Sequence, residues 1–246
     1  MVRGPVVQWS CSLVVLLAND GLLMNFLRRK LAESPEFARI APFGCYAVFT
    51  FFQSEFTPAG KFWFYICKTL LGAWLIWEIR PFVKEMRWRL SWEALVAGAG
   101  VFIIWVGLDG LYPRLVKLDA GANPWQQFGP GSALGWLYIV VHVAGMTVIV
   151  PPVEEIFYRS LLYRYFVKID FLSMPLGRFH LLSFIVTSVI FGLMHPDRWI
   201  AGILCGLAYQ GLVVRKNRLG DAMTAHAITN GLLGVWIVWK QAWTFW

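Results

Sequence analysis

Two adjacent carboxylates, Glu154 and Glu155, stand at the end of an apolar run and are followed by Arg159. Adjacent residues on a helix point about 100° apart, so the two carboxylates cannot serve the same point. Glu155 precedes Arg159 by four residues, which is the favourable order for an ion pair on a helix. We therefore expect Glu155 to pair with Arg159. Glu154 is then free to face a dry cleft, where a carboxylate can accept a proton from water.

Three further polar residues lie in apolar segments near the C-terminus. His195 ends an apolar run and is followed by Pro196. His226 and Asn230 are four residues apart, so they share one face of a helix. Two converging donors in a site of low dielectric constant could hold an oxyanion. Read singly, each cluster also fits a structural role: a helix start with surface charges, a buried histidine, or hydrogen bonding between helices.

In combination, the three clusters resemble a known family. The pattern EExxxR, then FxxxH, then HxxxN is similar to that of the CPBP intramembrane proteases, which include the type II CAAX prenyl endopeptidases and the Abi proteins. In this chain the pattern falls on Glu154-Glu155 with Arg159, Phe191 with His195, and His226 with Asn230. The resemblance covers about residues 150–230. The segment around Glu154 also resembles the CAAX-protease-related members of bacterial exosortase systems.

The resemblance implies a role for each residue. Glu154 would activate a water molecule, and His195 would orient or polarise it. His226 and Asn230 would stabilise the oxyanion. Glu155 and Arg159 would support these residues. The implied activity is an intramembrane endopeptidase that acts on a membrane-associated or lipid-modified protein or peptide.

The need for a metal is open at this point. Members of this family have been described both as metalloproteases and as metal-independent glutamate proteases. Glu154, His195 and His226 could bind zinc with one open position. The chain has no HExxH motif and no cysteine spacing typical of zinc, and we expect no cofactor.

A different class of function uses the same polar residues without hydrolysis. In a transporter or scaffold, Asp109, His142 and Glu154 would form an ion relay across the helices. We interpret His142 and His180 as structural, because neither belongs to a motif. A family member that binds peptides without cutting them is a third possibility, although all the expected side chains are present.

The elements that must position these residues are membrane-spanning helices. The 246 residues are 58% hydrophobic and only 15% charged, and the mean hydropathy is +0.59. Soluble domains are about 45–50% apolar and about 25% charged. We predict an all-α, polytopic transmembrane bundle of about seven or eight spans. We place the spans at residues 4–27, 40–57, 61–79, 92–112, 132–150, 180–195, 198–215 and 221–240.

The proline pair Pro151-Pro152 directly follows the predicted span 132–150. Proline is tolerated in the first turn of a helix and disrupts its interior. We expect Val150 to end or kink one helix and Val153 to start another, with Glu154 and Glu155 in its first turn. The new helix would be interfacial or a bent continuation into the membrane.

The cations predict how the spans are oriented. Alternate loops contain fifteen and six Lys and Arg residues. The richer set belongs in the cytoplasm, so both termini would lie outside and the active site would open toward the cytoplasm. The net charge of +8 falls in short loop clusters that suit anionic lipid, and we expect no nucleic-acid partner.

The expected organisation is a single integral membrane domain over residues 1–246, placed in a bacterial or archaeal cell membrane. Within it, residues 1–39 would be a variable N-terminal span or linker, and residues 132–240 would hold the catalytic core helices. The expected partners are the lipid bilayer and a peptide or membrane-anchored protein substrate.

Overall fold

The computed structural model of the chain describes residues 24–53, 56–117 and 121–246. These residues form helices and no strand, so the predicted all-α class is confirmed. Most of the predicted span 4–27 lies outside the described residues, while residues 24–33 are helical. In chain order the other elements are α2 (Pro35–Gln53), α3 (Pro58–Ile79), α4 (Trp92–Gly107), α5 (Pro124–Phe128), α6 (Ala133–Ala144), η1 (Gly145–Ile149), α7 (Val150–Glu155), η2 (Ile156–Leu162), α8 (Tyr163–Tyr165), η3 (Phe171–Ser173), α9 (Leu181–Leu193), α10 (Trp199–Lys216), α11 (Gly220–Lys240) and η4 (Trp243–Phe245).

Several helices begin at side chains that satisfy the first backbone N–H groups. The side chains of Thr57, Ser91, Asn123 and Ser132 each accept a hydrogen bond from a backbone N–H two or three residues ahead. These first N–H groups have no partner within the helix itself. The caps therefore fix where α3, α4, α5 and α6 start.

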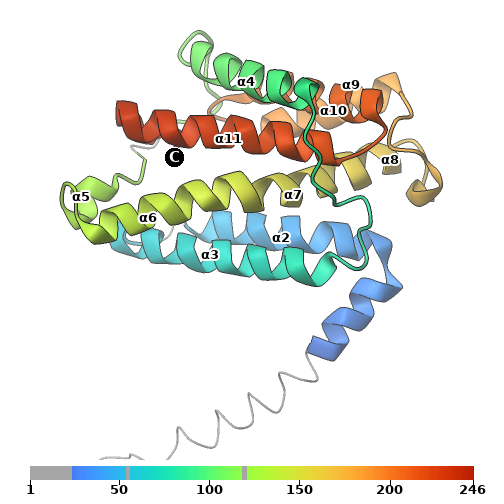
Figure 1. Ribbon diagram of the computed structural model, residues 1–246, viewed down its shortest axis with the longest axis horizontal. Helices are drawn as coiled ribbons and strands as arrows, with labels where there is room; N and C mark the ends of the chain where they lie inside the picture. Colours follow the sequence, from blue (N-terminus) through green and yellow to red (C-terminus); the bar gives the residue numbers. More distant parts are fainter. Residues whose placement is uncertain (1–23, 54–55, 118–120) are drawn as a thin grey trace, which may run out of the picture.

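The long run from α6 to α8 is the central element. In Figure 1, α2 and α3 lie along one side of α6 and α7, α11 lies along the other, and α4, α9 and α10 lie beyond α11. The run therefore contributes to both halves of the bundle. Any residue on α7 can face α2 and α3 or α11, depending on its position around the helix.

This run corrects part of one sequence prediction, because Val150 ends no helix and Val153 starts none; the alternative of a kink at Val150 stays a prediction. The chain continues as one helix from Ala133 to Tyr165, and the pair Pro151-Pro152 lies inside it, flanked by the wider π-helical segments η1 and η2. Proline has no N–H to donate, and its ring crowds the preceding turn. A π-helical turn absorbs that irregularity without a break.

Three helices are long and apolar enough to cross a membrane within the described residues: Ala59–Ile79, Ala133–Tyr165 and Gly220–Lys240. Two shorter apolar helices are Trp92–Gly107 and Leu181–Leu193. The predicted number of seven or eight spans is not established by these helices. It stays a prediction.

The outer surface is unusually apolar for a protein in water. Trp77, Ile103 and Trp239 are each more than 60% exposed, and so are Leu70 and Val235. Soluble monomers rarely expose contiguous apolar patches of large area. Such side chains suit a lipid environment, in agreement with an integral membrane protein.

A buried ionic cluster joins the chain segments at one end of the bundle. Glu85 lies in the loop between α3 and α4, 2.6 Å from Arg39 of α2 and 3.2 Å from Arg164 of α8. Ser160 of η2 donates a hydrogen bond to the same carboxylate. Among the cations assigned to cytoplasmic loops, Arg39, Arg159 and Arg164 are instead buried in helices.

The charged form of Glu85 is favoured by its neighbours. Burial acts against it, but the charge of Arg39 and hydrogen bonds from Ser160 and Arg39 hold the pKa of Glu85 below its usual value. A carboxyl group with a lowered pKa stabilises the fold above its unfolded pKa and loses that effect as pH falls through the folded pKa.

We predict that Glu85→Gln lowers the midpoint of thermal unfolding at neutral pH, because two buried guanidinium groups lose their counter-ion. Removing one partner of a buried ion pair costs about 3–5 kcal/mol. The difference from the unmodified protein should shrink as pH is lowered below the usual carboxyl pKa of 4.5. The measurement is thermal unfolding in detergent at several pH values. Glu33→Gln, at an exposed pair, is the control and should change little, whereas an equal effect of both variants would contradict the prediction.

Candidate active site

Glu154 and Glu155 point in different directions from α7. Glu155 is fully buried, with Oε2 3.2 Å from Nε of Arg159. The expected ion pair between Glu155 and Arg159 is therefore present. Glu154 is partly buried, and among the described residues it pairs with no Lys or Arg; Nε2 of His226, at 4.0 Å, lies within ion-pair distance. The Oε2 atom of Glu154 is buried, yet it has no hydrogen-bond partner among the described residues.

The guanidinium group of Arg159 is enclosed by aromatic rings. It lies 4.4 Å from the ring centre of Phe191, 5.5 Å from Tyr158 and 5.8 Å from Tyr209. Ring faces attract cations, and the attraction is larger away from water. The aromatic cage and Glu155 together hold this charge inside the bundle.

His226 joins α11 to α7 through the second oxygen of Glu155. Its Nδ1 atom lies 2.9 Å from Oε1 of Glu155, so Nδ1–H donates to that carboxylate and Nε2 faces away from it. Nε2 lies 4.0 Å from Oε2 of Glu154. The ring also stacks on Tyr209, with 5.1 Å between ring centres. Glu155 thus fixes both the orientation of His226 and the side on which Nε2 is available.

His195 reaches the same region because α9 is short. Thirteen residues of α9 rise about 20 Å, so the helix ends before it could cross a hydrocarbon layer of about 30 Å. Close packing with α10 fixes this end, since a Cβ atom on Gly202 would lie 2.8 Å from Cα of Gly192. Nδ1 of His195 is 2.9 Å from the carbonyl oxygen of Phe191, which leaves Nε2 available to a ligand.

Asn230 lies one turn beyond His226 on α11. Its Nδ2 atom donates to the carbonyl oxygen of Met146, at 2.7 Å. In the π-helical segment η1 the N–H of Val150 bonds to Gly145. The residue after it, Pro151, has no N–H, so the Met146 carbonyl is open to the side chain of Asn230. One N–H of Asn230 then remains for another acceptor.

Glu154, His195, His226 and Asn230 all line one cavity of about 70 Å³. A cavity of this size holds water but is too small for a peptide chain, since ligand pockets are about 300–1,000 Å³. Trp105, Tyr209 and Thr229 line it too, and the sequence analysis did not single them out. In the sequence these three residues are marked only by an aromatic ring or a hydroxyl group within an apolar helix. Such groups more often contribute to packing between helices.

The residues of the alternative ion relay do not gather in this cavity. His142 lines a different and larger cavity. Asp109 lies 3.0 Å from Arg114 and 3.3 Å from Arg198. Among the described residues, Glu154 is therefore the single member of the proposed relay that lines the small cavity.

The donor groups around the cavity are of types that bind metal ions. One carboxylate and two imidazoles match zinc chemically. Within the described ranges, however, no three His, Cys, Asp or Glu side chains are grouped closely enough to hold a metal ion. The arrangement therefore does not fit a preformed three-ligand site.

Comparison with known proteins supports the sequence resemblance. Residues 135–232 match the family model described as type II CAAX prenyl endopeptidase Rce1-like. The resemblance to the CPBP family is thereby confirmed over this segment, which contains all the candidate site residues. The comparisons with curated proteins and with solved structures found no match. The family match supports protease activity in general and a membrane location.

We predict unequal stability effects for substitutions of the two neighbouring carboxylates. Glu155→Gln leaves Arg159 without its counter-ion in a buried cage, which should cost about 3–5 kcal/mol. Glu154→Gln should leave stability nearly unchanged, because the Glu154 carboxylate accepts no hydrogen bond at Oε2. Thermal unfolding of the two variants in the same detergent tests this difference. Equal midpoints would show that the two carboxylates are not positioned as described.

Proposed function

We propose, on the premise of the match to the type II CAAX prenyl endopeptidase family, that this protein is an intramembrane endopeptidase with Glu154 as its general base. Its substrate would be a membrane-associated or lipid-modified protein or peptide. The observation that carries this proposal is that Glu154 lines a cavity large enough for water, while its Oε2 atom is buried without a hydrogen-bond partner among the described residues. A carboxylate oxygen in that state is an acceptor available to a water molecule.

The proposed reaction begins with a water molecule between Glu154 and His195. Glu154 accepts a proton as the water oxygen attacks the carbonyl carbon of the scissile bond. The carbonyl oxygen becomes an oxyanion, which the remaining N–H of Asn230 can stabilise. The C–N bond then breaks, and the proton held by Glu154 passes to the leaving amine.

The roles of His195 and His226 follow from which nitrogen is free. Nε2 of His195 can accept a hydrogen bond from the attacking water and so orient it. Nε2 of His226 can donate to the oxyanion when its ring carries a second proton, since Nδ1–H is already committed to Glu155. Glu155 and Arg159 are positioning residues, because neither lines the cavity.

The reaction as proposed needs no metal ion. This part of the proposal is supported by the arrangement of the described residues, in which no three His, Cys, Asp or Glu side chains are grouped to hold a metal ion. The general base and the oxyanion donors are all supplied by the chain itself.

We predict that Glu154→Gln abolishes cleavage while the protein stays folded. General acid–base catalysis contributes about 10²–10⁴-fold to a rate, so turnover should fall at least about 100-fold. The measurement compares the membrane proteomes of source cells that produce the unmodified protein, Glu154→Gln or Glu33→Gln. A precursor should accumulate, or a C-terminus should stay uncut, in the Glu154→Gln cells alone. Full processing by folded Glu154→Gln would refute the assignment of the base.

We also predict that chelation leaves activity unchanged. Purified protein would be treated with EDTA, dialysed and assayed on the substrate found in the proteome comparison, and its bound metal would be measured by mass spectrometry. We expect far less than one metal ion per chain and the same rate before and after treatment. A loss of activity that zinc restores would show that a metal takes part.

A further inference from the structure

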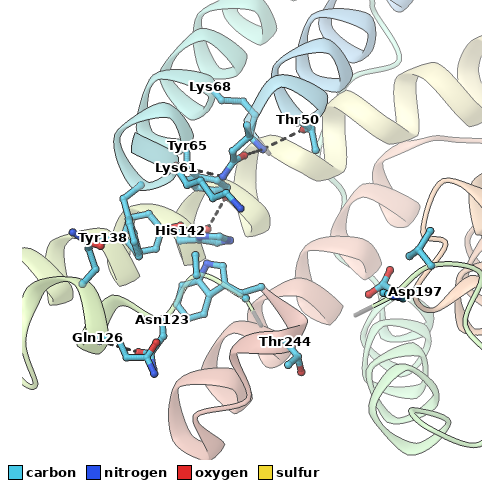
Figure 2. A pocket seen from close by; sticks show the side chains of 18 residues that line it. Thr50, Lys61, Tyr65, Lys68, Asn123, Gln126, Tyr138, His142, Asp197 and Thr244 are labelled. Carbon is cyan, nitrogen blue, oxygen red and sulfur yellow. Dashed lines mark hydrogen bonds between the residues drawn. The ribbon is translucent and has the colours of Figure 1, made fainter. Parts of the chain in front are cut away.

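A second cavity, of about 710 Å³, is bounded by the end of α2, the first half of α3, the helix α6 and the residues around η4. Its wall includes Gln53, Lys68, Asn123, His142 and Trp246. In Figure 2, Lys68 and Thr50 lie on one side of the cavity, and Asn123 and Gln126 lie on the opposite side. Its volume is within the range of about 300–1,000 Å³ typical of ligand pockets.

Lys68 is buried in this wall without a carboxylate partner. It lies in the middle of a candidate membrane span, and only 5% of its surface is exposed. Its Nζ atom donates to Oε1 of Gln53 at 2.9 Å and to Oγ1 of Thr50 at 3.2 Å. It also lies 4.6 and 4.9 Å from the ring centres of Tyr46 and Tyr65. No carboxylate among the described residues pairs with it.

The charge on the wall is positive. Lys61 and Lys117 line the cavity together with Lys68. Among the described residues, the acidic side chain in the wall is Asp197, and it is paired with Arg198. A charge at membrane depth is costly and is usually paired. Basic pockets between spanning helices bind the head groups of anionic lipids, so the wall favours an anionic ligand.

Several hydrogen-bond donors in the wall are uncommitted. An ammonium group has three protons to donate, and Lys68 uses two of them. Oδ1 of Asn123 accepts from the N–H groups of Trp125 and Gln126, which leaves its NH2 group as a donor. Trp246 lines the cavity, and its Nε1 atom is buried without a partner among the described residues. Donors on both sides of the cavity suit a group with several acceptor oxygens, such as a phosphate.

An apolar hollow shares a wall with this polar cavity. Phe62 and Tyr138 line both spaces. The other residues of the hollow are Trp63, Ile66, Phe128, Leu134 and Leu137, and three of them (Trp63, Leu134 and Leu137) are about half exposed. Exposed apolar side chains of this kind suit acyl chains. A ligand with an anionic head group and an apolar chain matches both spaces, whereas a free phosphate ion would use the cavity alone.

We propose that the large cavity binds the head group of an anionic phospholipid, with Lys68 as the counter-ion of its phosphate. The start of one acyl chain lies in the apolar hollow. A zwitterionic lipid carries the same phosphate together with a cation, which the positive wall disfavours. The lipid is a component of the bilayer and not a substrate, so this inference is independent of the proposed function. The head group would join α2, α3 and α6 through one ligand.

The test measures which lipids stay bound to the full-length protein, by native mass spectrometry in detergent. Delipidated protein is incubated with equal amounts of dioleoylphosphatidylglycerol and dioleoylphosphatidylcholine, whose acyl chains are identical, so that a difference reports the head group. Glycerophosphoglycerol, which is the head group without acyl chains, and inorganic phosphate are added separately as competitors. The measurement is repeated after Lys68→Met, after Asn123→Asp and after Lys168→Met, a control at an exposed lysine.

The two site variants test the same anion in different ways. Lys68→Met removes the positive charge. Asn123→Asp keeps the helix cap, because Asp accepts the same backbone N–H groups as Asn, but it replaces the uncommitted donor with a negative charge. Asn123→Asp therefore tests the site even if Lys68→Met fails to fold. The comparison of the two lipids on the unmodified protein needs neither variant.

A hydrogen bond to a charged group changes binding by about tenfold or more. We expect phosphatidylglycerol to be retained over phosphatidylcholine by that factor. The preference should be lost in Lys68→Met and in Asn123→Asp and should persist in Lys168→Met. Equal retention of the two lipids, or a preference that survives in either folded site variant, would overturn the inference. Displacement of the lipid by equimolar glycerophosphoglycerol or inorganic phosphate would identify a free phosphate as the ligand and would also overturn it.

Discussion

A carboxylate that is fully removed from solvent must be compensated by charges and hydrogen bonds, and Glu155 receives both. Arg159 comes from the next turn of the same helical run, and His226 comes from α11, 71 residues further along the chain. Because uncompensated buried charge costs several kcal/mol, this contact restricts how α7 can rotate against α11. Once Glu155 faces α11, Glu154 must point about 100° away, and that direction leads into the small cavity. The position of the candidate base is thus set by its neighbour.

The proline pair adds a second constraint on the same cavity. A regular helix would use the carbonyl groups ahead of Pro151 for its own hydrogen bonds. The missing proline N–H and the wider turn at η1 expose the carbonyl of Met146, which Asn230 takes. An irregular backbone at membrane depth is tolerated where its polar groups find protein partners. The proline pair, which from the sequence suggests a helix end, therefore fixes the position of the Asn230 side chain in the candidate site.

Sequence reasoning succeeded where the physics is local. The pair of Glu155 and Arg159 follows from a four-residue spacing, and the common face of His226 and Asn230 follows from the same period. At Val150 sequence reasoning left a helix end and a kink open, and the helix end is wrong because a π-helical turn accommodates the proline pair. The contacts of Glu155 with His226 and of Asn230 with Met146 join residues 71 and 84 positions apart. No spacing rule reaches such pairs. A resemblance between motifs can predict that these residues share one site, but it cannot predict which atoms form hydrogen bonds.

Two cavities of very different volume lie along one helical run. The small one keeps a carboxylate oxygen, two imidazoles and an amide around a volume suited to water. The small volume keeps bulk water out, so the dielectric constant around these polar groups stays low. Their electrostatic interactions are therefore stronger than they would be in water. A peptide does not fit in this volume. The large cavity lies elsewhere along the run, and its buried Lys68 contacts Gln53 at the end of α2. A second anion beside Glu154 would oppose formation of the oxyanion, so a cavity too small for further charged groups suits the proposed reaction.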